Sequence, residues 1–81
     1  MAAKDPMLAK LGERLRTHRK EHGWSQEELA FKCGMHRTYI GAVERGEYNL
    51  TVLTLHKVTA ILGISMSEVL EGLPKRRRKR R

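Results

Sequence analysis

The chain has 81 residues, of which 40% are hydrophobic and 5% aromatic, and its formal net charge is +8. This length allows one domain with a modest core, and no stretch approaches the roughly 20 apolar residues of a membrane span, so we expect no membrane partner. Cys33 is the only cysteine, which excludes an internal disulfide. Together with a first segment that has no apolar signal core, it favours a reducing cytoplasm.

The positive charge is concentrated at one end. Seven of the 17 basic residues occupy positions 75–81, whereas residues 1–74 carry ten basic and nine acidic side chains. We expect self-repulsion to keep the tail, 74–81, disordered. It is interpreted first as a nonspecific DNA arm; a localisation or membrane-surface run, or a solvated tail with no discrete role, are the alternatives. The rest of the chain is nearly neutral, so charge alone does not identify a function.

The first predicted helix covers about residues 6–22. Asp5 is placed to cap it, and Pro6 suits the first helical position because the missing N–H would be unpaired there. Gly23 offers a left-handed stop. The apolar stripe of this helix has spacings of three and four and consists of Leu8, Leu11 and Leu15.

Two short helices are predicted next, over about 25–33 and 37–45. Ser25 and Glu28 form a capping box at the first of them, and Gly34 permits a sharp turn between the two. Ala30 is small at the position where the helices must cross. Their inward residues share a core and are Leu29, Ala30, Cys33, Met35, Ile40 and Val43.

A fourth helix is predicted over about 52–62, capped by Thr51, and a short fifth one after the Ser65–Glu68 capping box. The stripe predicted for the fourth helix consists of Val52, Leu55, Val58 and Leu62. No segment shows the alternation of a strand. The expected fold is therefore all-α with five helices, organised as an N-terminal arm (1–6), a domain (7–73) and the basic tail.

The outer face of the third helix carries the functional prediction. Burial of the shared core leaves Arg37, Thr38, Gly41 and Arg45 on the opposite side of this helix. Spacings of four and eight place Arg37, Gly41 and Arg45 along one line on that side. An exposed helix of this width fits the roughly 12 Å major groove of DNA.

This stretch and its surroundings, over about residues 7–73, resemble the Cro/C1-type helix-turn-helix family, also called the XRE family. The resemblance is carried by SQEELA (25–30), Gly34, RTYI (37–40), ERG (44–46) and Asn49. Within the family, it is strongest to restriction–modification controller proteins. It implies a five-helix Cro/C1 repressor-like domain that reads a palindromic operator in double-stranded DNA as a homodimer, acting at the nucleoid as a repressor or autoregulatory controller. No cofactor, metal or small-molecule ligand is expected.

The resemblance also implies roles for single residues. Arg37, Thr38 and Gly41 would face base edges, and Arg37 has the donors for a bidentate pair with guanine. The residues assigned to the DNA backbone or its vicinity are Ser25, Gln26, His36, Tyr39, Arg45 and Asn49, with Tyr39 near thymine methyl groups. Glu47 and Tyr48 replace a base-reading arginine of some family members, so we do not expect base readout from that loop.

Glu44 would repel phosphate if it stood free on this helix. In the family this glutamate pairs with an arginine of the first helix, which aligns with Arg19. The resemblance thus implies a structural, partly buried Arg19–Glu44 ion pair.

Apolar residues near the end of the domain exceed what one small core needs, and some of them are candidates for a two-fold dimer interface. These candidates are Ile61, Ile64, Met66, Val69 and Leu70.

Other classes of function have weaker support. The His18–His22 and Cys33–His36 spacings suit a metal, but Cys33 belongs to the buried set, so no zinc site is expected. No catalytic constellation indicates an enzyme. An antitoxin-like protein-interaction module that binds DNA secondarily is the main alternative, and a nonspecific architectural DNA protein is another.

Overall fold

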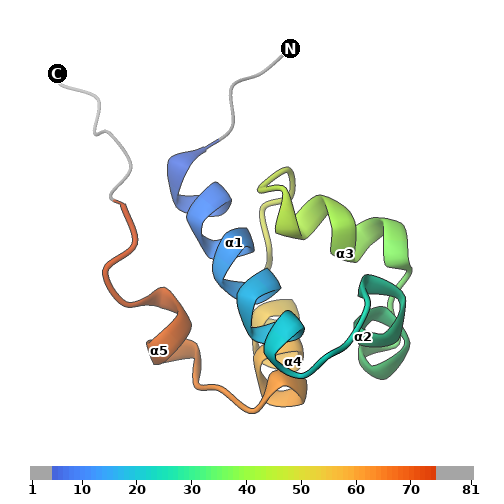
Figure 1. The fold of residues 1–81 in the computed structure, drawn as a ribbon. Helices are drawn as coiled ribbons and strands as arrows, with labels where there is room; N and C mark the ends of the chain where they lie inside the picture. Colours follow the sequence, from blue (N-terminus) through green and yellow to red (C-terminus); the bar gives the residue numbers. More distant parts are fainter. Residues whose placement is uncertain (1–4, 75–81) are drawn as a thin grey trace, which may run out of the picture.

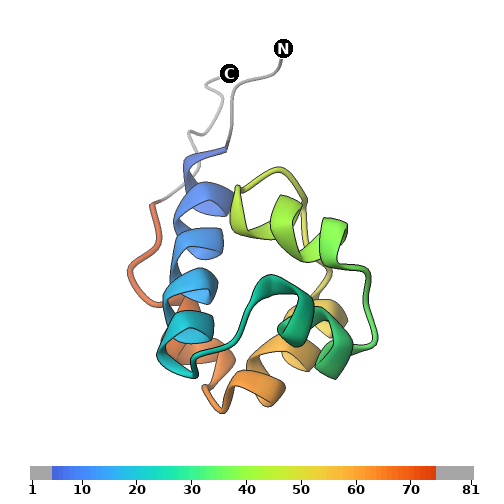
Figure 2. The ribbon, with the colours of Figure 1, turned by 45° about the vertical axis from the view of Figure 1, so that its right-hand side comes forward.

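The computed structural model describes residues 5–74, and within them the chain forms five α-helices and no strand, as predicted. The helices are α1 (Pro6–Glu21), α2 (Gln26–Cys33), α3 (Arg37–Glu44), α4 (Val52–Leu62) and α5 (Met66–Leu70). In Figure 1, α1 runs through the molecule with α5 on one side and α2 and α3 on the other. In the turned view of Figure 2, α5 lies behind the lower part of α1. The arm before residue 5 and the basic tail from residue 75 lie outside the described residues.

The helix starts are fixed by side-chain caps that the sequence predicts. The Asp5 carboxylate accepts the Met7 backbone N–H at 2.9 Å. At α2 the capping box is complete, because the Ser25 hydroxyl accepts the Glu28 N–H at 3.0 Å and the Glu28 carboxylate accepts the Ser25 N–H at 2.7 Å. The Ser65 hydroxyl accepts an N–H in the first turn of α5. Each cap satisfies a donor that the helix leaves without a partner.

All five helices contribute to one hydrophobic core. Its buried members are Leu11, Leu15, Leu29, Ala30, Cys33, Ile40, Val43, Leu55, Val58, Leu62 and Val69. Among the helices of residues 5–74, none has the length and hydropathy that crossing a membrane requires.

Two predictions about apolar residues were wrong. Val69 is only 1% exposed, so it belongs to the core and has no surface to offer a dimer partner. It is the residue that the short α5 directs fully inward. Val52 is 70% exposed, because the first turn of α4 lies outside the core that Leu55 and Val58 enter. The other dimer candidates keep accessible surface and are Ile61, Ile64, Met66 and Leu70.

Helix α5 is held to α1 by a polar contact as well as by the core. The Arg14 guanidinium donates to the backbone carbonyl of Val69 at 3.0 Å and also to that of Glu71. Carbonyls at the end of a helix lack intrahelical partners and attract positive charge. Arg14 therefore caps the C-terminal end of α5 and holds this helix against α1.

Two glycines allow α1 and the end of α3 to approach closely. A Cβ on Gly12 would lie 2.4 Å from the carbonyl oxygen of Val43 and 2.6 Å from that of Glu44. Gly46 has a φ of +76°, and a Cβ there would lie 2.6 Å from the Cα of Ala9. Both contacts are with backbone, which cannot move aside cheaply, so α3 reaches its position only with glycine at these points.

We predict that Gly12→Ala lowers the free energy of unfolding by about 1–3 kcal/mol through overpacking. Gly41→Ala is the matched control, since the nearest atoms to its new Cβ are the flexible side-chain ends of Arg45 and Gln26, at 3.2 and 3.3 Å. Alanine is also favoured over glycine inside a helix by up to about 1 kcal/mol. Urea unfolding followed by circular dichroism measures both. Equal losses in the two variants would contradict the proposed clash at Gly12.

Candidate nucleic-acid interface

Helices α2 and α3 are joined by a turn of three residues. Gly34 ends α2 with a φ of +69°, and the Met35 N–H donates to the Ala30 carbonyl at 2.8 Å. The His36 imidazole then caps α3 by accepting the Thr38 N–H at 3.1 Å. Ala30 is 2% exposed, as predicted for a small residue where two helices cross. These contacts fix the angle between the two helices.

The outer face of α3 differs in part from the predicted one. Arg37, Thr38 and Arg45 are exposed, as the helical spacing predicts. Gly41 is buried, and its expected place on the open face was wrong: the side chains of Gln26 and Arg45 lie over it. Glycine has no side chain to project past them. The atoms nearest to a Cβ at this position would be the ends of these two side chains, not backbone atoms of α2.

The Arg19–Glu44 ion pair, which the family resemblance implied, is present and more buried than expected. The Arg19 Nε donates to Glu44 Oε2 at 2.7 Å and Nη2 donates to Oε1 at 3.0 Å. The two side chains are 8% and 3% exposed. The remaining guanidinium nitrogen of Arg19 donates to the Trp24 carbonyl at 2.7 Å. This pair removes the Glu44 carboxylate from the surface and ties α3 to α1.

Gln26 extends this network to the start of α2. Its amide nitrogen donates to Glu44 Oε1 at 3.0 Å. The side chain is therefore oriented by the buried pair, with its oxygen over Gly41. Ser25, which precedes it, is exposed and has its hydroxyl engaged in the capping box. Both residues stand at the positive end of α2, where anions are favoured.

Arg45 is engaged by a residue that the sequence did not single out as a partner. Its Nε and Nη2 donate to the two carboxylate oxygens of Glu47 at 3.0 and 3.1 Å. These hydrogen bonds, and the charge of Glu47, raise the pKa of the Arg45 guanidinium. Both side chains are about half exposed, at 55% and 45%, so the pair is open to exchange with solvent or a ligand. Asn49, farther along the same loop, is exposed.

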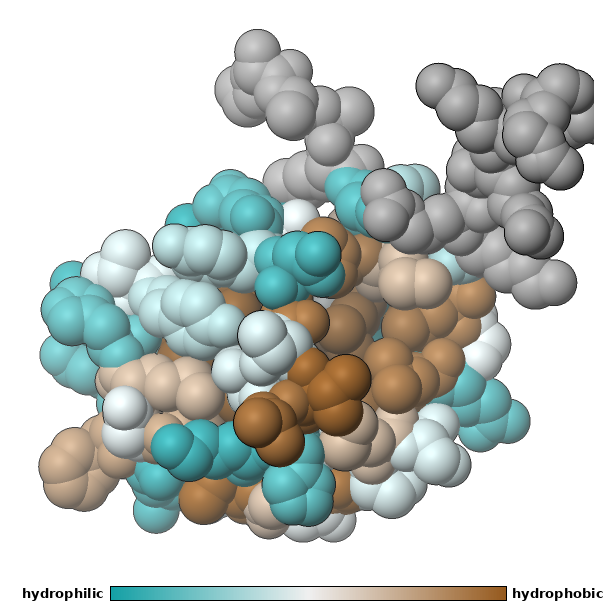
Figure 3. All heavy atoms as spheres, turned by 180° about the vertical axis from the view of Figure 1, so that it is seen from behind, coloured by the Kyte–Doolittle hydropathy of each residue, from teal (hydrophilic) through white to brown (hydrophobic). Residues whose placement is uncertain are grey.

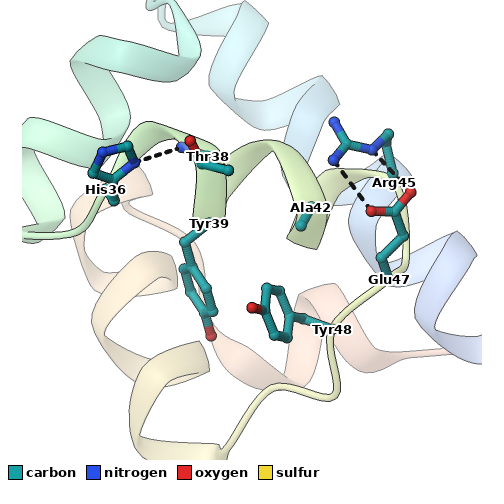
Figure 4. Close-up of a pocket in the computed structure, with 7 residues that line it drawn as sticks. All are labelled: His36, Thr38, Tyr39, Ala42, Arg45, Glu47 and Tyr48. Carbon is teal, nitrogen blue, oxygen red and sulfur yellow. Dashed lines mark hydrogen bonds and ion pairs between the residues drawn. The ribbon is translucent and has the colours of Figure 1, made fainter.

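A hollow opens beside α3, between the helix and the loop that follows it (Figure 4). The lining residues are His36, Thr38, Tyr39, Ala42, Arg45, Glu47 and Tyr48. The Tyr39 and Tyr48 rings are tilted by 42° with their centroids 4.9 Å apart. Sequence reasoning missed Ala42 and Tyr48 as members of this surface. Ala42 stands four residues after Thr38 and three before Arg45, so helical spacing alone was sufficient to find it.

The histidines and the cysteine considered for a metal have other structural roles. The His22 ring stacks on Trp24 with centroids 4.1 Å apart, and its Nε2 is hydrogen-bonded to the Leu62 carbonyl at 2.7 Å. Cys33 is buried, and this burial raises the pKa of its thiol. Within residues 5–74, no three His, Cys, Asp or Glu side chains gather where they could hold a metal ion.

Comparison with known proteins identifies this arrangement. The sequence model of the helix-turn-helix family matches residues 15–69. A protein of Neisseria meningitidis serogroup B described as a hypothetical transcription factor is 43% identical over 64 residues; the match covers 79% of this chain and 60% of that protein.

Two solved structures are similar over most of the chain. The restriction–modification controller protein C.AhdI from Aeromonas hydrophila has a TM-score of 0.73 and 44% identity, covering 76% of this chain and 94% of the other. The controller protein C.Esp1396I, solved as a tetramer with its natural 35 base-pair operator, has a TM-score of 0.72 and 35% identity, covering 80% and 86%.

We predict that Glu44→Ala lowers the free energy of unfolding by about 3–5 kcal/mol, because Arg19 then keeps a buried charge without its main partner. Glu13→Ala is the control. It breaks the exposed Lys10–Glu13 ion pair, in which Nζ and Oε1 are 3.2 Å apart, and should change the free energy of unfolding by less than about 1 kcal/mol. Thermal or urea unfolding of the two variants provides the comparison. Similar small losses in both would mean that the buried pair does not hold α3.

Proposed function

The chain belongs to this helix-turn-helix family, and we propose that it is a transcription regulator that binds a palindromic operator as a homodimer, acting in the cytoplasm at the nucleoid. The observation that carries the proposal is the open face of α3, which presents polar side chains on a helix whose inner side is fixed by a buried ion pair. A rigid helix with one exposed face is what insertion into a major groove requires.

The geometry of that face supports proposed roles for single residues. Arg37 and Thr38 are exposed in the first turn of α3, and recognition helices contact base edges with their N-terminal residues. We assign base readout to these two. Arg45 and Asn49 are assigned to phosphates, with Ser25 and Gln26 at the start of α2 and His36 at the start of α3. For Arg45 to bind a phosphate, its hydrogen bonds to Glu47 must be exchanged.

The homodimer is assigned to the apolar surface around α4. Leu53 is 81% exposed and Val52 70%, and both lie on the helix that also carries the half-buried Ile61. Figure 3 shows hydrophobic side chains gathered on the face of the molecule that is turned away from the viewer in Figure 1. A small domain that leaves large aliphatic groups in water gains by burying them against a second copy. In a two-fold dimer, two recognition helices enter successive major grooves about 34 Å apart.

The function is tested by selecting bound sequences from random duplex DNA with the purified full chain. A palindromic consensus with half-sites about one helical turn apart supports the proposal. Recovery of unrelated sequences would exclude sequence-specific regulation and leave a nonspecific DNA-binding protein. The antitoxin-like alternative requires a stoichiometric second protein, and the similarity to controller proteins does not favour it.

We predict that Arg37→Ala weakens operator binding by about 1–3 kcal/mol and relaxes the preference at one base pair of each half-site. Lys20→Ala is the control for charge, since it removes one exposed positive charge in the last turn of α1, outside the face of α3. Fluorescence anisotropy with operators altered one pair at a time measures both effects. Equal weakening on every sequence would show that Arg37 contacts only phosphate.

We predict that Leu53→Ser shifts the chain from dimer to monomer at micromolar concentration. Phe31→Ser is the matched control, because Phe31 is 86% exposed but lies on α2, away from the assigned interface. Sedimentation equilibrium distinguishes the two states. If Phe31→Ser dissociates the dimer and Leu53→Ser does not, the interface has been assigned to the wrong face.

A further inference from the structure

A second hollow lies where α1, the start of α2 and the end of α3 meet. Its lining residues are Arg16, Arg19, Gln26, Glu44 and Arg45. Three of these five residues are arginines and one is a glutamate. The net charge that the hollow offers to a ligand therefore depends on which of the guanidinium groups are neutralised by a carboxylate.

Two of the three guanidinium groups are already compensated. The buried Glu44 carboxylate binds Arg19 at 2.7 and 3.0 Å. The Glu47 carboxylate binds Arg45 at 3.0 and 3.1 Å. If a DNA phosphate took the place of Glu47 at Arg45, the displaced carboxylate would repel the same DNA. The Arg45–Glu47 pair therefore contributes no net positive charge in either arrangement.

Arg16 is the uncompensated cation of this hollow. Its side chain is exposed and has no hydrogen-bonding or ionic partner among residues 5–74. It stands four residues after Gly12 and three before Arg19, and residues at these spacings share one face of a helix. Gly12 touches the backbone at the end of α3, and Arg19 forms the ion pair with α3. Arg16 thus leaves α1 at its junction with α3, beside Gln26 of α2.

A phosphodiester group suits this position. Arginine presents its N–H donors in a planar fork that matches the oxygens of a phosphate. In a helix-turn-helix the second helix lies in the major groove, while the first helix crosses the DNA backbone. The hollow lies at Gln26, where that first helix begins, so the DNA group that comes nearest to it is a phosphate. Base edges are contacted from the first turn of α3, at the other end of that helix.

We infer that Arg16 binds a backbone phosphate of the operator in this hollow, and that it makes a larger net electrostatic contribution to DNA binding than Arg45 does. The inference rests on the proposed function, since it requires α3 to lie in the major groove. It extends the DNA interface to α1, a helix whose described role is to support α3. The contact is independent of base sequence, because every nucleotide carries the same phosphate.

The experiment measures the dissociation constant of the selected operator as a function of salt concentration, with the full chain and its variants. Each phosphate contact adds about 0.9 to the slope of log Kd against log salt concentration. Arg16→Ala should lower the slope by about this amount. Its Kd relative to the unaltered chain should then rise about 3.5-fold when salt is lowered from about 0.4 M to about 0.1 M. Arg16→Lys, which keeps the charge, should retain the slope.

Two controls separate this contact from the general effect of charge. Lys20→Ala removes an exposed cation one turn farther along α1, from a residue that does not line the hollow. The double variant Arg45→Ala with Glu47→Gln removes the compensated pair. Both should leave the slope nearly unchanged. Every variant keeps positions 75–81, so the contribution of the basic tail cancels in the comparison.

The sequence preference provides a second readout. Because a phosphate contact carries no sequence information, Arg16→Ala should weaken operators altered at single base pairs by the same factor as the selected operator. Circular dichroism melting confirms that each variant is folded.

The inference is overturned if Arg16→Ala leaves the slope unchanged, or if Lys20→Ala or the double variant lowers the slope as much. Failure to select any operator overturns the proposed function as well. A defined operator that Arg16→Ala binds with an unchanged slope overturns this inference alone.

Discussion

The buried ion pair between Arg19 and Glu44 is the constraint on which the interface depends. It unites α1, the end of α3, the start of α2 through Gln26, and the connecting segment through the Trp24 carbonyl. Removing two charges from water is unfavourable unless their hydrogen-bonding groups are satisfied, and here they are. Any other rotation of α3 about its axis would separate these partners inside the protein. The pair thus fixes a single orientation of the outer face, even if its net contribution to stability is small.

The backbone of the same glutamate is fixed to the same helix. Its carbonyl oxygen lies against Gly12, where a Cβ would come within 2.6 Å, and Gly12 precedes Arg19 by seven residues, or about two turns of α1. The end of α3 is therefore held at two points along one face of α1, once by contact and once by charge. Its start is held by the Gly34 turn and the His36 cap. With both ends fixed, α3 can present its outer side chains without being reshaped by a ligand.

The elements of the fold were predictable because their signals are local. Asp5, Ser25 and Thr51 each stand directly before a helix, and Gly34 directly after one, and these residues act within one turn of their own position. What sequence reasoning misplaced depends on contacts between elements. Val69 was a candidate for the dimer interface and Val52 belonged to an apolar stripe. Only the packing of α5 decides that Val69 is buried, and only the position of the first turn of α4 decides that Val52 is exposed. Gly41 is covered by Gln26 from another helix, which no periodicity within α3 predicts.

Charge at the interface is largely compensated within the folded part of the chain. Residues 1–74 carry a net charge of +1, and two carboxylates on or near α3, of Glu44 and Glu47, neutralise Arg19 and Arg45. Long-range attraction of this region to phosphate is therefore weak, and the excess positive charge of the chain resides in positions 75–81. Discrimination between sequences must then come from short-range contacts on a fixed surface. Such contacts gain most from rigidity, because a methyl group or a base edge is read only at van der Waals or hydrogen-bond distance. A helix held as firmly as α3 can offer such contacts without first being ordered by its ligand.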